Sequence, residues 1–144
     1  ILKPQSKRIE NYPEMRDRIV LHIEETEGQI ERLDTVFDML QKDHSALKDT
    51  MLSVGGSMAA LSHAAAGDEI LKDTFANHAF ENYEIAAYMS LLRLAENLDL
   101  RTVAPLLQQT LEQEQAMAQW IADNIALVTT RYVELRAADA TAKR

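Results

Sequence analysis

Three long stretches of this chain carry apolar residues at alternating steps of three and four, and this spacing limits the fold more than any other feature. The average step matches the 3.6 residues of one α-helical turn, so each stretch predicts a helix with one apolar face. Such helices bury their apolar faces against one another. Only four Gly and three Pro occur in the 144 residues to interrupt them. We therefore expect an all-α protein with a single domain over residues 1–144.

The boundaries and the apolar faces of the three helices follow from the same pattern. The first helix is expected from Pro13 to about residue 42, and its predicted face is Ile19, Ile23, Thr26, Ile30, Leu33, Phe37 and Leu40. The second follows Gly67, and its predicted face is Leu71, Phe75, His78, Asn82, Ile85, Met89 and Leu92. The third begins near Thr102, and its predicted face is Val103, Leu107, Thr110, Glu114, Met117, Ile121, Ile125, Val128, Tyr132 and Leu135.

The remaining segments predict how these helices are connected. The short turn near residues 97–99 favours antiparallel neighbours. Residues 46–66 predict a smaller crossover helix that packs on the bundle. Residues 1–9 read as the end of a further helix that begins before Ile1 and closes a four-helix bundle. Residues 137–144 are expected to form a flexible tail.

The charge and composition exclude several classes of partner. The formal net charge of −8 argues against nucleic acid or an anionic membrane surface as the main partner. No apolar run approaches the roughly 20 residues of a membrane-spanning helix, and no signal peptide is recognisable. Cysteine is absent, which excludes thiolate metal sites and fits a cytoplasmic location.

Polar residues interrupt each predicted face at one place, and carboxylates gather there. Glu81 and Glu114 lie at similar distances from the turn near residue 98, so an antiparallel pair of helices brings them to nearly the same level. Glu25 and His22 flank the polar interruption of the first helix. A buried carboxylate is costly unless it is paired, protonated or bound to a metal. These residues are therefore candidate metal ligands.

Three strings of the sequence resemble the YciE/YciF family of bacterial stress proteins. They are His-Ile-Glu-Glu-Thr-Glu-Gly-Gln-Ile-Glu-Arg-Leu at 22–33, Glu-Asn-Tyr-Glu-Ile-Ala-Ala-Tyr at 81–88 and Leu-Gln-Gln-Thr-Leu-Glu-Gln-Glu at 107–114. The resemblance implies a ferritin-like four-helix bundle in the cytoplasm, a homodimer, and a dinuclear iron or manganese site in the bundle core. It also implies that Glu25, Glu81 and Glu114 are the inward-facing carboxylates, with a further ligand before Ile1.

The sequence departs from this family at the nitrogen ligands. Asn82 stands where the family has histidine, and neither Glu25 nor Glu114 is followed three residues later by histidine. His22 and His78 are the candidates to supply nitrogen instead, while Glu84 is expected to face water or to support another ligand.

Two functions remain open. One is a ferritin-like metalloprotein that oxidises iron or removes peroxide. The other is a metal-free helical bundle that serves as a structural or protein-interaction module. The ordinary explanations of the same residues are that Glu25 belongs to a solvated charge run, and that each histidine is a partly buried surface residue.

Overall fold

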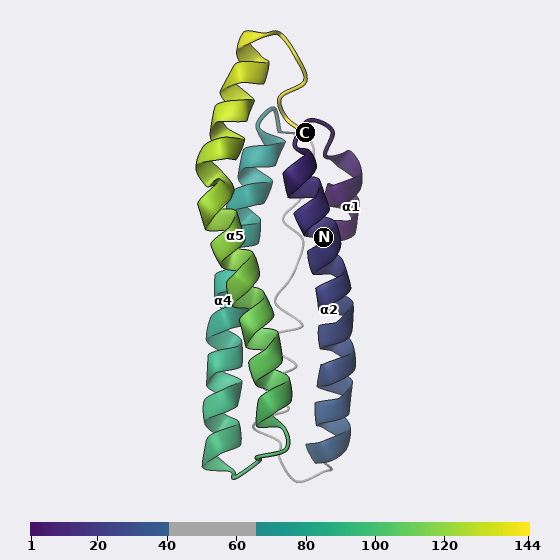
Figure 1. The fold of residues 1–144 in the computed structure, drawn as a ribbon, viewed down its shortest axis with the longest axis vertical. Helices are drawn as coiled ribbons and strands as arrows, with labels where there is room; N and C mark the ends of the chain where they lie inside the picture. Colours follow the sequence, from purple (N-terminus) through teal and green to yellow (C-terminus); the bar gives the residue numbers. More distant parts are fainter. Residues whose placement is uncertain (41–65) are drawn as a thin grey trace.

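The computed structural model describes residues 1–40 and 66–144. These residues form four helices and no strand, which confirms the all-α prediction. The helices are α1 (Leu2–Arg8), α2 (Pro13–Leu40), α4 (Glu69–Asn97) and α5 (Ala104–Ala137). The predicted crossover at 46–66 falls almost entirely outside the described residues. The three long helices lie side by side, with α1 next to the start of α2 (Figure 1). None of the helices in the described ranges is long and apolar enough to cross a membrane.

A tight turn makes α4 and α5 antiparallel neighbours, as predicted. Asp99 has φ of 54°, a left-handed conformation that Asp tolerates better than most residues. The turn also lets the Leu100 amide donate to the Ala95 carbonyl oxygen at 2.8 Å. Pro105 occupies the first turn of α5, where its missing N–H breaks no helical hydrogen bond. The two helices then pack along their length, and α2 packs against α5.

Two apolar clusters fill the bundle, one toward each end. The cluster near the α4–α5 turn comprises Val36, Leu40, Tyr88, Leu91, Ala95, Val103, Leu107 and Leu111. The cluster near the start of α2 comprises Ile9, Tyr12, Met15, Ile19, Ile70, Met117, Ile121, Val128, Leu135 and Ala142. Between them on α5 lies Glu114, which has 0% of its surface exposed. A buried polar layer therefore separates the two apolar halves.

The predicted apolar face is confirmed for α5, holds for α2 except at Ile30, and is wrong for α4. Ile30 is 55% exposed, Phe75 52% and Met89 58%, although all three were assigned to buried faces. The buried residues of α4 are instead Glu69, Ile70, Asp73, Thr74, Asn77, Glu81, Tyr88, Leu91 and Ala95. This is a rotation by about one residue, or roughly 100° around the helix axis. The error arose because the face that is buried is the more polar one.

The C-terminal segment, which the sequence predicts to be a flexible tail, folds back onto the bundle in the structure. Asp139 adopts φ of 53° and turns the chain back along the bundle. The Tyr12 hydroxyl then donates to the Ala142 carbonyl oxygen at 2.5 Å, and the Ile70 amide donates to the Lys143 carbonyl oxygen at 2.9 Å. Ala142 is 5% exposed. The segment therefore ties the start of α2 to the start of α4.

Residues 1–9 contain a short helix, and buried polar contacts hold it on α4. The Arg8 Nε donates to Glu69 Oε1 at 2.6 Å, and the Asn77 side chain donates to Gln5 Oε1 at 3.0 Å. Glu69 is 2% exposed, so loss of Arg8 would leave a buried carboxylate without this partner. Whether α1 continues an upstream helix stays a prediction.

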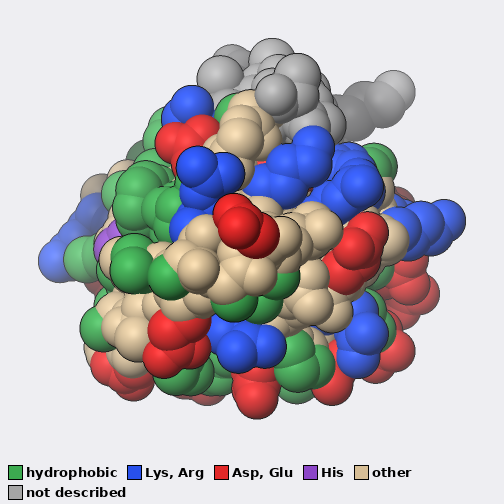
Figure 2. All heavy atoms as spheres, turned by 90° about the horizontal axis from the view of Figure 1, so that it is seen from above, with side chains coloured by type: hydrophobic (Ala, Val, Ile, Leu, Met, Phe, Trp, Pro, Cys, Tyr) green, Lys and Arg blue, Asp and Glu red, His purple; other side chains and the backbone are tan. Residues whose placement is uncertain are grey.

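The outer surface at the end of the bundle where the C-terminus lies is of mixed charge. Lys and Arg side chains are interspersed there with Asp and Glu (Figure 2). Ion pairs such as Arg144 Nε with Glu10 Oε1, at 3.3 Å, result from this mixture.

Candidate metal centre

Three ligand-type side chains from three helices meet in the polar layer. They are His22 of α2, Glu81 of α4 and Glu114 of α5, with exposed fractions of 2%, 3% and 0%. One potential ligand atom from each lies within 4.8 Å of the other two. The His22 Nε2 is 3.2 Å from Glu81 Oε2 and 3.7 Å from Glu114 Oε2. The predicted meeting of Glu81 and Glu114 at one level is therefore present in the structure.

The helical repeat explains why these side chains point inward. His22 follows the buried Ile19 by three residues, and Glu114 follows the buried Leu107 by seven. Glu81 precedes the buried Tyr88 by seven. Residues three, four or seven apart share one face of a helix. Because the apolar residues on the same helix face are buried, the polar residues between them are buried as well.

The two glutamates each expose an unsatisfied oxygen to the cluster. Glu81 Oε2 and Glu114 Oε2 are buried and have no hydrogen-bond partner among the described residues. Two ionised carboxylates both accept hydrogen bonds and cannot bond to each other. A proton on one of the carboxyl groups, the Nε2–H of a protonated His22 or a bound cation can satisfy them, and without any of these their burial would cost several kcal/mol.

Glu25, a predicted ligand, contacts His22 instead of joining the cluster. The Glu25 Oε2 lies 2.9 Å from His22 Nδ1 and accepts from the Arg18 guanidinium at 3.0 Å. Burial raises the pKa of Glu25, but the hydrogen bonds from His22 and Arg18 outweigh it and hold the pKa below its usual value. An ionised Glu25 places the imidazole proton on Nδ1. This contact leaves Nε2 directed at Glu81 and Glu114, as is common for metal-binding histidines.

His78, the other predicted nitrogen donor, is not brought to the cluster. Its Nε2 lies 3.3 Å from Asn82 Nδ2 on the outer side of α4. The two residues line an open hollow together with Gln115 and Gln119 of α5. The rotation of α4 by one residue, which buries Glu81, also turns His78 away from the bundle axis.

Glu84 lies beside the cluster and contacts Glu114, which agrees with the expectation that it supports another ligand. Burial raises its pKa to about 8, reinforced by the charge of Glu114 and a hydrogen-bonding contact with it. The signal that could have found Glu84 is its spacing, because residues 77, 81, 84 and 88 follow the steps of one buried face. Because this face of α4 is polar, a search for apolar residues did not identify it as buried.

The charged groups of the cluster shift one another's pKa values. Burial lowers the pKa of His22, but contacts with Glu81 and Glu25 and the charge of Glu114 together raise it to about 9. Burial and the adjacent Glu81 raise the pKa of Glu114 to about 8, against the opposing effects of His22 and Gln29. At neutral pH the cluster therefore retains protons that a divalent cation would have to displace.

A second group of polar side chains fixes Glu114 from the other side. The Gln29 amide donates to Glu114 Oε1 and, at 3.4 Å, to Gln113 Oε1. Arg32 donates to the same Gln113 oxygen and, through Nε, to Thr110 Oγ1 at 3.1 Å. Because Oε1 of Glu114 is occupied by Gln29, its Oε2 is the atom left for the cluster.

The donor set fits a divalent cation. One imidazole nitrogen and two or three carboxylate oxygens suit iron(II) and manganese(II). His22, Glu81 and Glu114 could hold such an ion, and Glu84 contacts Glu114. The unsatisfied buried oxygens of Glu81 and Glu114 are the structural reason for this assignment.

Comparisons with known proteins agree with the fold. Protein YciF of Escherichia coli (strain K12) is 36% identical over 106 residues, which is 66% of this chain and 60% of YciF. A crystal structure of a protein from Xanthomonas campestris pv. campestris superimposes with a TM-score of 0.74 at 27% identity, covering 94% of this chain and 83% of that one. The family described as "Domain of unknown function (DUF892)" matches residues 1–134. The chain therefore belongs to the DUF892 family of YciF-type proteins.

Proposed function

We propose that this protein is a ferritin-like metalloprotein that binds iron or manganese through His22, Glu81 and Glu114. The observation that carries the proposal is the convergence of three buried ligand atoms from three helices, two of which are carboxylate oxygens without a hydrogen-bond partner. Glu84 would complete the carboxylate set and Glu25 would orient His22. A bound redox-active ion would supply one-electron chemistry with oxygen or peroxide.

The family resemblance supports the wider parts of the proposal. It favours a dinuclear centre, a homodimer, a cytoplasmic location and a role in iron or oxidative stress. Helical bundles of the ferritin-like class carry their metals on inward-facing glutamates of several helices, and the polar layer lies at a comparable place in the bundle core. Sedimentation analysis of the purified chain tests the dimer separately from the metal.

Manganese(II) binding is the direct test of the site. The protein, stripped with a chelator, is titrated with manganese(II) while the free ion is followed by electron paramagnetic resonance. Saturable binding of at least one ion per chain is expected. Glu81→Gln and Glu114→Gln should each weaken it by at least about tenfold, the effect typical of a lost ligand or supporting contact. Glu112→Gln, an exposed change on the same helix as Glu114, is the matched control.

The bound spectrum identifies the ligands and the number of ions. An electron spin-echo signal from histidine nitrogen that disappears in His22→Gln would place the ion at this imidazole. A coupled manganese pair gives closer hyperfine lines than an isolated ion. The proposal would be refuted if the protein bound neither manganese nor iron. It would also be refuted if Glu81→Gln and Glu114→Gln both bound manganese(II) with unchanged affinity.

The metal-free interaction module remains the second candidate, and the raised pKa values of Glu84 and Glu114 support it. A cluster in which these carboxyl groups keep their protons can satisfy itself by sharing them with neighbouring carboxylates. Metal-free protein that neither binds nor is stabilised by iron or manganese at pH 8, where the protons are more easily lost, would favour this candidate.

A further inference from the structure

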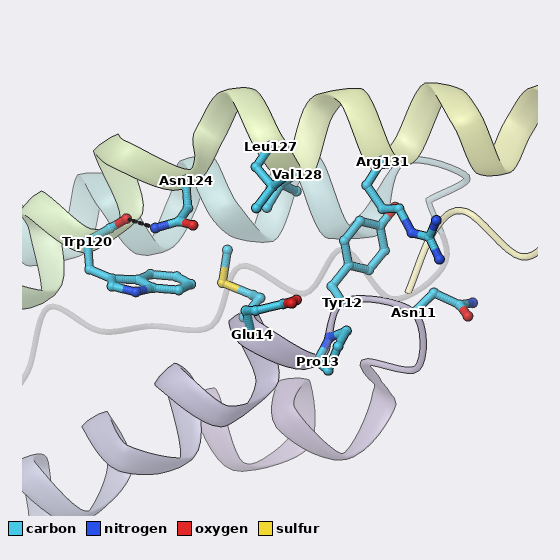
Figure 3. A pocket seen from close by; sticks show the side chains of 10 residues that line it. Asn11, Tyr12, Pro13, Glu14, Trp120, Asn124, Leu127, Val128 and Arg131 are labelled. Carbon is cyan, nitrogen blue, oxygen red and sulfur yellow. Dashed lines mark hydrogen bonds between the residues drawn. The ribbon is translucent and has the colours of Figure 1, made fainter.

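A cavity of about 230 Å³ lies between the start of α2 and the middle of α5, separate from the polar layer. Figure 3 shows Leu127 and Val128 on its α5 side and Glu14 on its α2 side. The Trp120 indole forms one end, and the Tyr12 ring lies toward the other. None of these residues takes part in the candidate metal centre.

The Tyr12 end of this pocket is rigid. The Tyr12 hydroxyl is committed to the Ala142 carbonyl oxygen at 2.5 Å, and the side chain is 3% exposed, so its ring is held in place. Met15, 2% exposed, closes the floor. At the other end Asn124 donates to the Trp120 carbonyl oxygen at 2.8 Å, which leaves the amide oxygen of Asn124 free to accept.

The pocket lining carries one charge of each sign, Glu14 and Arg131. In Figure 3 the Glu14 carboxylate lies between the Trp120 indole and the Tyr12 ring, while the Arg131 guanidinium is turned away toward Asn11. Glu14 forms no ion pair with any residue in the described ranges, whereas Arg131 lies 3.9 Å from Glu134. A cation beside the Trp120 indole would therefore gain Glu14 as a partner, whereas one beside the Tyr12 ring would meet Arg131.

The walls favour an alkylated ammonium group over a primary amine. A primary ammonium ion has three N–H donors and needs as many acceptors. The pocket offers the Glu14 carboxylate and the Asn124 amide oxygen, and its other walls are aromatic and aliphatic. Quaternary ammonium groups need no hydrogen bonds and are attracted to aromatic faces.

We propose that this pocket is a binding site for a small alkylated ammonium ion, held by the indole of Trp120 with Glu14 as its counter-ion. The site does not depend on the metal, so either proposal can fail without the other.

The sole tryptophan of the chain is Trp120, so its fluorescence reports on this pocket alone. The protein is titrated with choline and, in parallel, with 3,3-dimethylbutan-1-ol, which has the same shape without the charge. Choline should change the emission saturably, and the alcohol should bind about tenfold more weakly, as expected for one charge interaction at a partly exposed site. Failure of choline to saturate, or equal affinity for the two compounds, would overturn the proposal.

Variants assign the roles of the two key residues. Glu14→Gln should reduce choline affinity to about that of the alcohol, while Glu31→Gln, an exposed change farther along α2, should leave it unchanged. Trp120→Leu removes the reporter, so its loss of choline binding is followed by saturation-transfer NMR of the ligand. Choline affinity that is unchanged in Glu14→Gln, or lowered equally in Glu31→Gln, contradicts the assignment. Manganese binding should be the same in Glu14→Gln as in the unmodified protein.

Discussion

Replacing Glu114 by Leu should stabilise the metal-free protein at neutral pH and have little effect at pH 5. The pKa of Glu114 is raised from 4.5 to about 8 in the folded protein. A carboxyl group with a raised folded-state pKa binds more protons folded than unfolded, so stability falls as the pH rises from 4.5 toward 8. Since Glu114 is fully buried, solvent does not screen this effect.

The magnitude follows from the distance between the pH and the unfolded-state pKa. At pH 7 the gap is about 2.5 pH units, so ionisation of the unfolded chain lowers stability by about 3 kcal/mol. At pH 5 the same calculation gives about 1 kcal/mol. Loss of the hydrogen bond from Gln29 subtracts about 1–2 kcal/mol at both values. Glu114→Leu should therefore gain about 1–2 kcal/mol at pH 7, and its advantage at pH 7 should exceed that at pH 5 by about 2 kcal/mol.

Urea unfolding with a chelator present measures both quantities. The difference between the two pH values is the more secure one, because packing changes contribute equally to each. Glu112→Leu, on the exposed side of the same helix, should show no such difference. The same effect of Glu114→Leu at both pH values, or a larger gain at pH 5, would refute the reasoning. Added manganese(II) should stabilise the unmodified protein and leave Glu114→Leu unchanged.

Three further predictions concern the surroundings of the cluster. Gln29→Leu should weaken manganese binding by about 10-fold or more in calorimetry, since Glu114 Oε1 loses its donor. Manganese affinity should increase from pH 6 to 9, because the raised pKa values of His22 and Glu114 make protons compete with the ion. Arg8→Met should lower the free energy of unfolding by about 3–5 kcal/mol in urea, because it leaves Glu69 buried without its partner.

Each of these has its own control and contrary outcome. Arg93→Met removes a fully exposed ion pair and should change stability by less than about 1 kcal/mol. Restoration of stability in Arg8→Met combined with Glu69→Gln would support the pairing, and its absence would contradict it. Manganese affinity that is flat from pH 6 to 9 would show that the protons are not displaced. Gln108→Leu changes an exposed site and is the control for Gln29→Leu. Equal manganese affinity in the two variants would show that Gln29 does not support the site.

The all-α class and the antiparallel pairing of α4 with α5 could be predicted from the sequence, and the orientation of α4 could not. On α5 the apolar residues and the buried face coincide, so periodicity placed Glu114 inward correctly. On α4 the more apolar face, with Phe75 and Met89, is the outer one. The inner face carries Asn77, Glu81 and Glu84, and a criterion based on hydrophobicity alone rejects such a face.

The polarity of the buried faces also limited how well the candidate ligands could be predicted. Glu81 and Glu114 were identified because a hairpin brings equidistant residues to one level. His22 was a candidate nitrogen ligand because of its position one turn from Glu25. In the structure His22 points inward and Glu25 lies behind it. This arrangement depends on the rotation of α2 about its axis, by about 100° for a shift of one residue, which one sequence does not specify.

The polar layer between the two apolar clusters also has a consequence for how the helices align lengthwise. The apolar residues of α5 repeat every seven positions, so sliding α5 past α4 by one repeat would still bury hydrocarbon against hydrocarbon. Such a slip would set Leu107 or Ile121 beside Glu81 and leave that carboxylate without Glu114. A single charged level in an otherwise repetitive interface can thus select one register among several of similar packing.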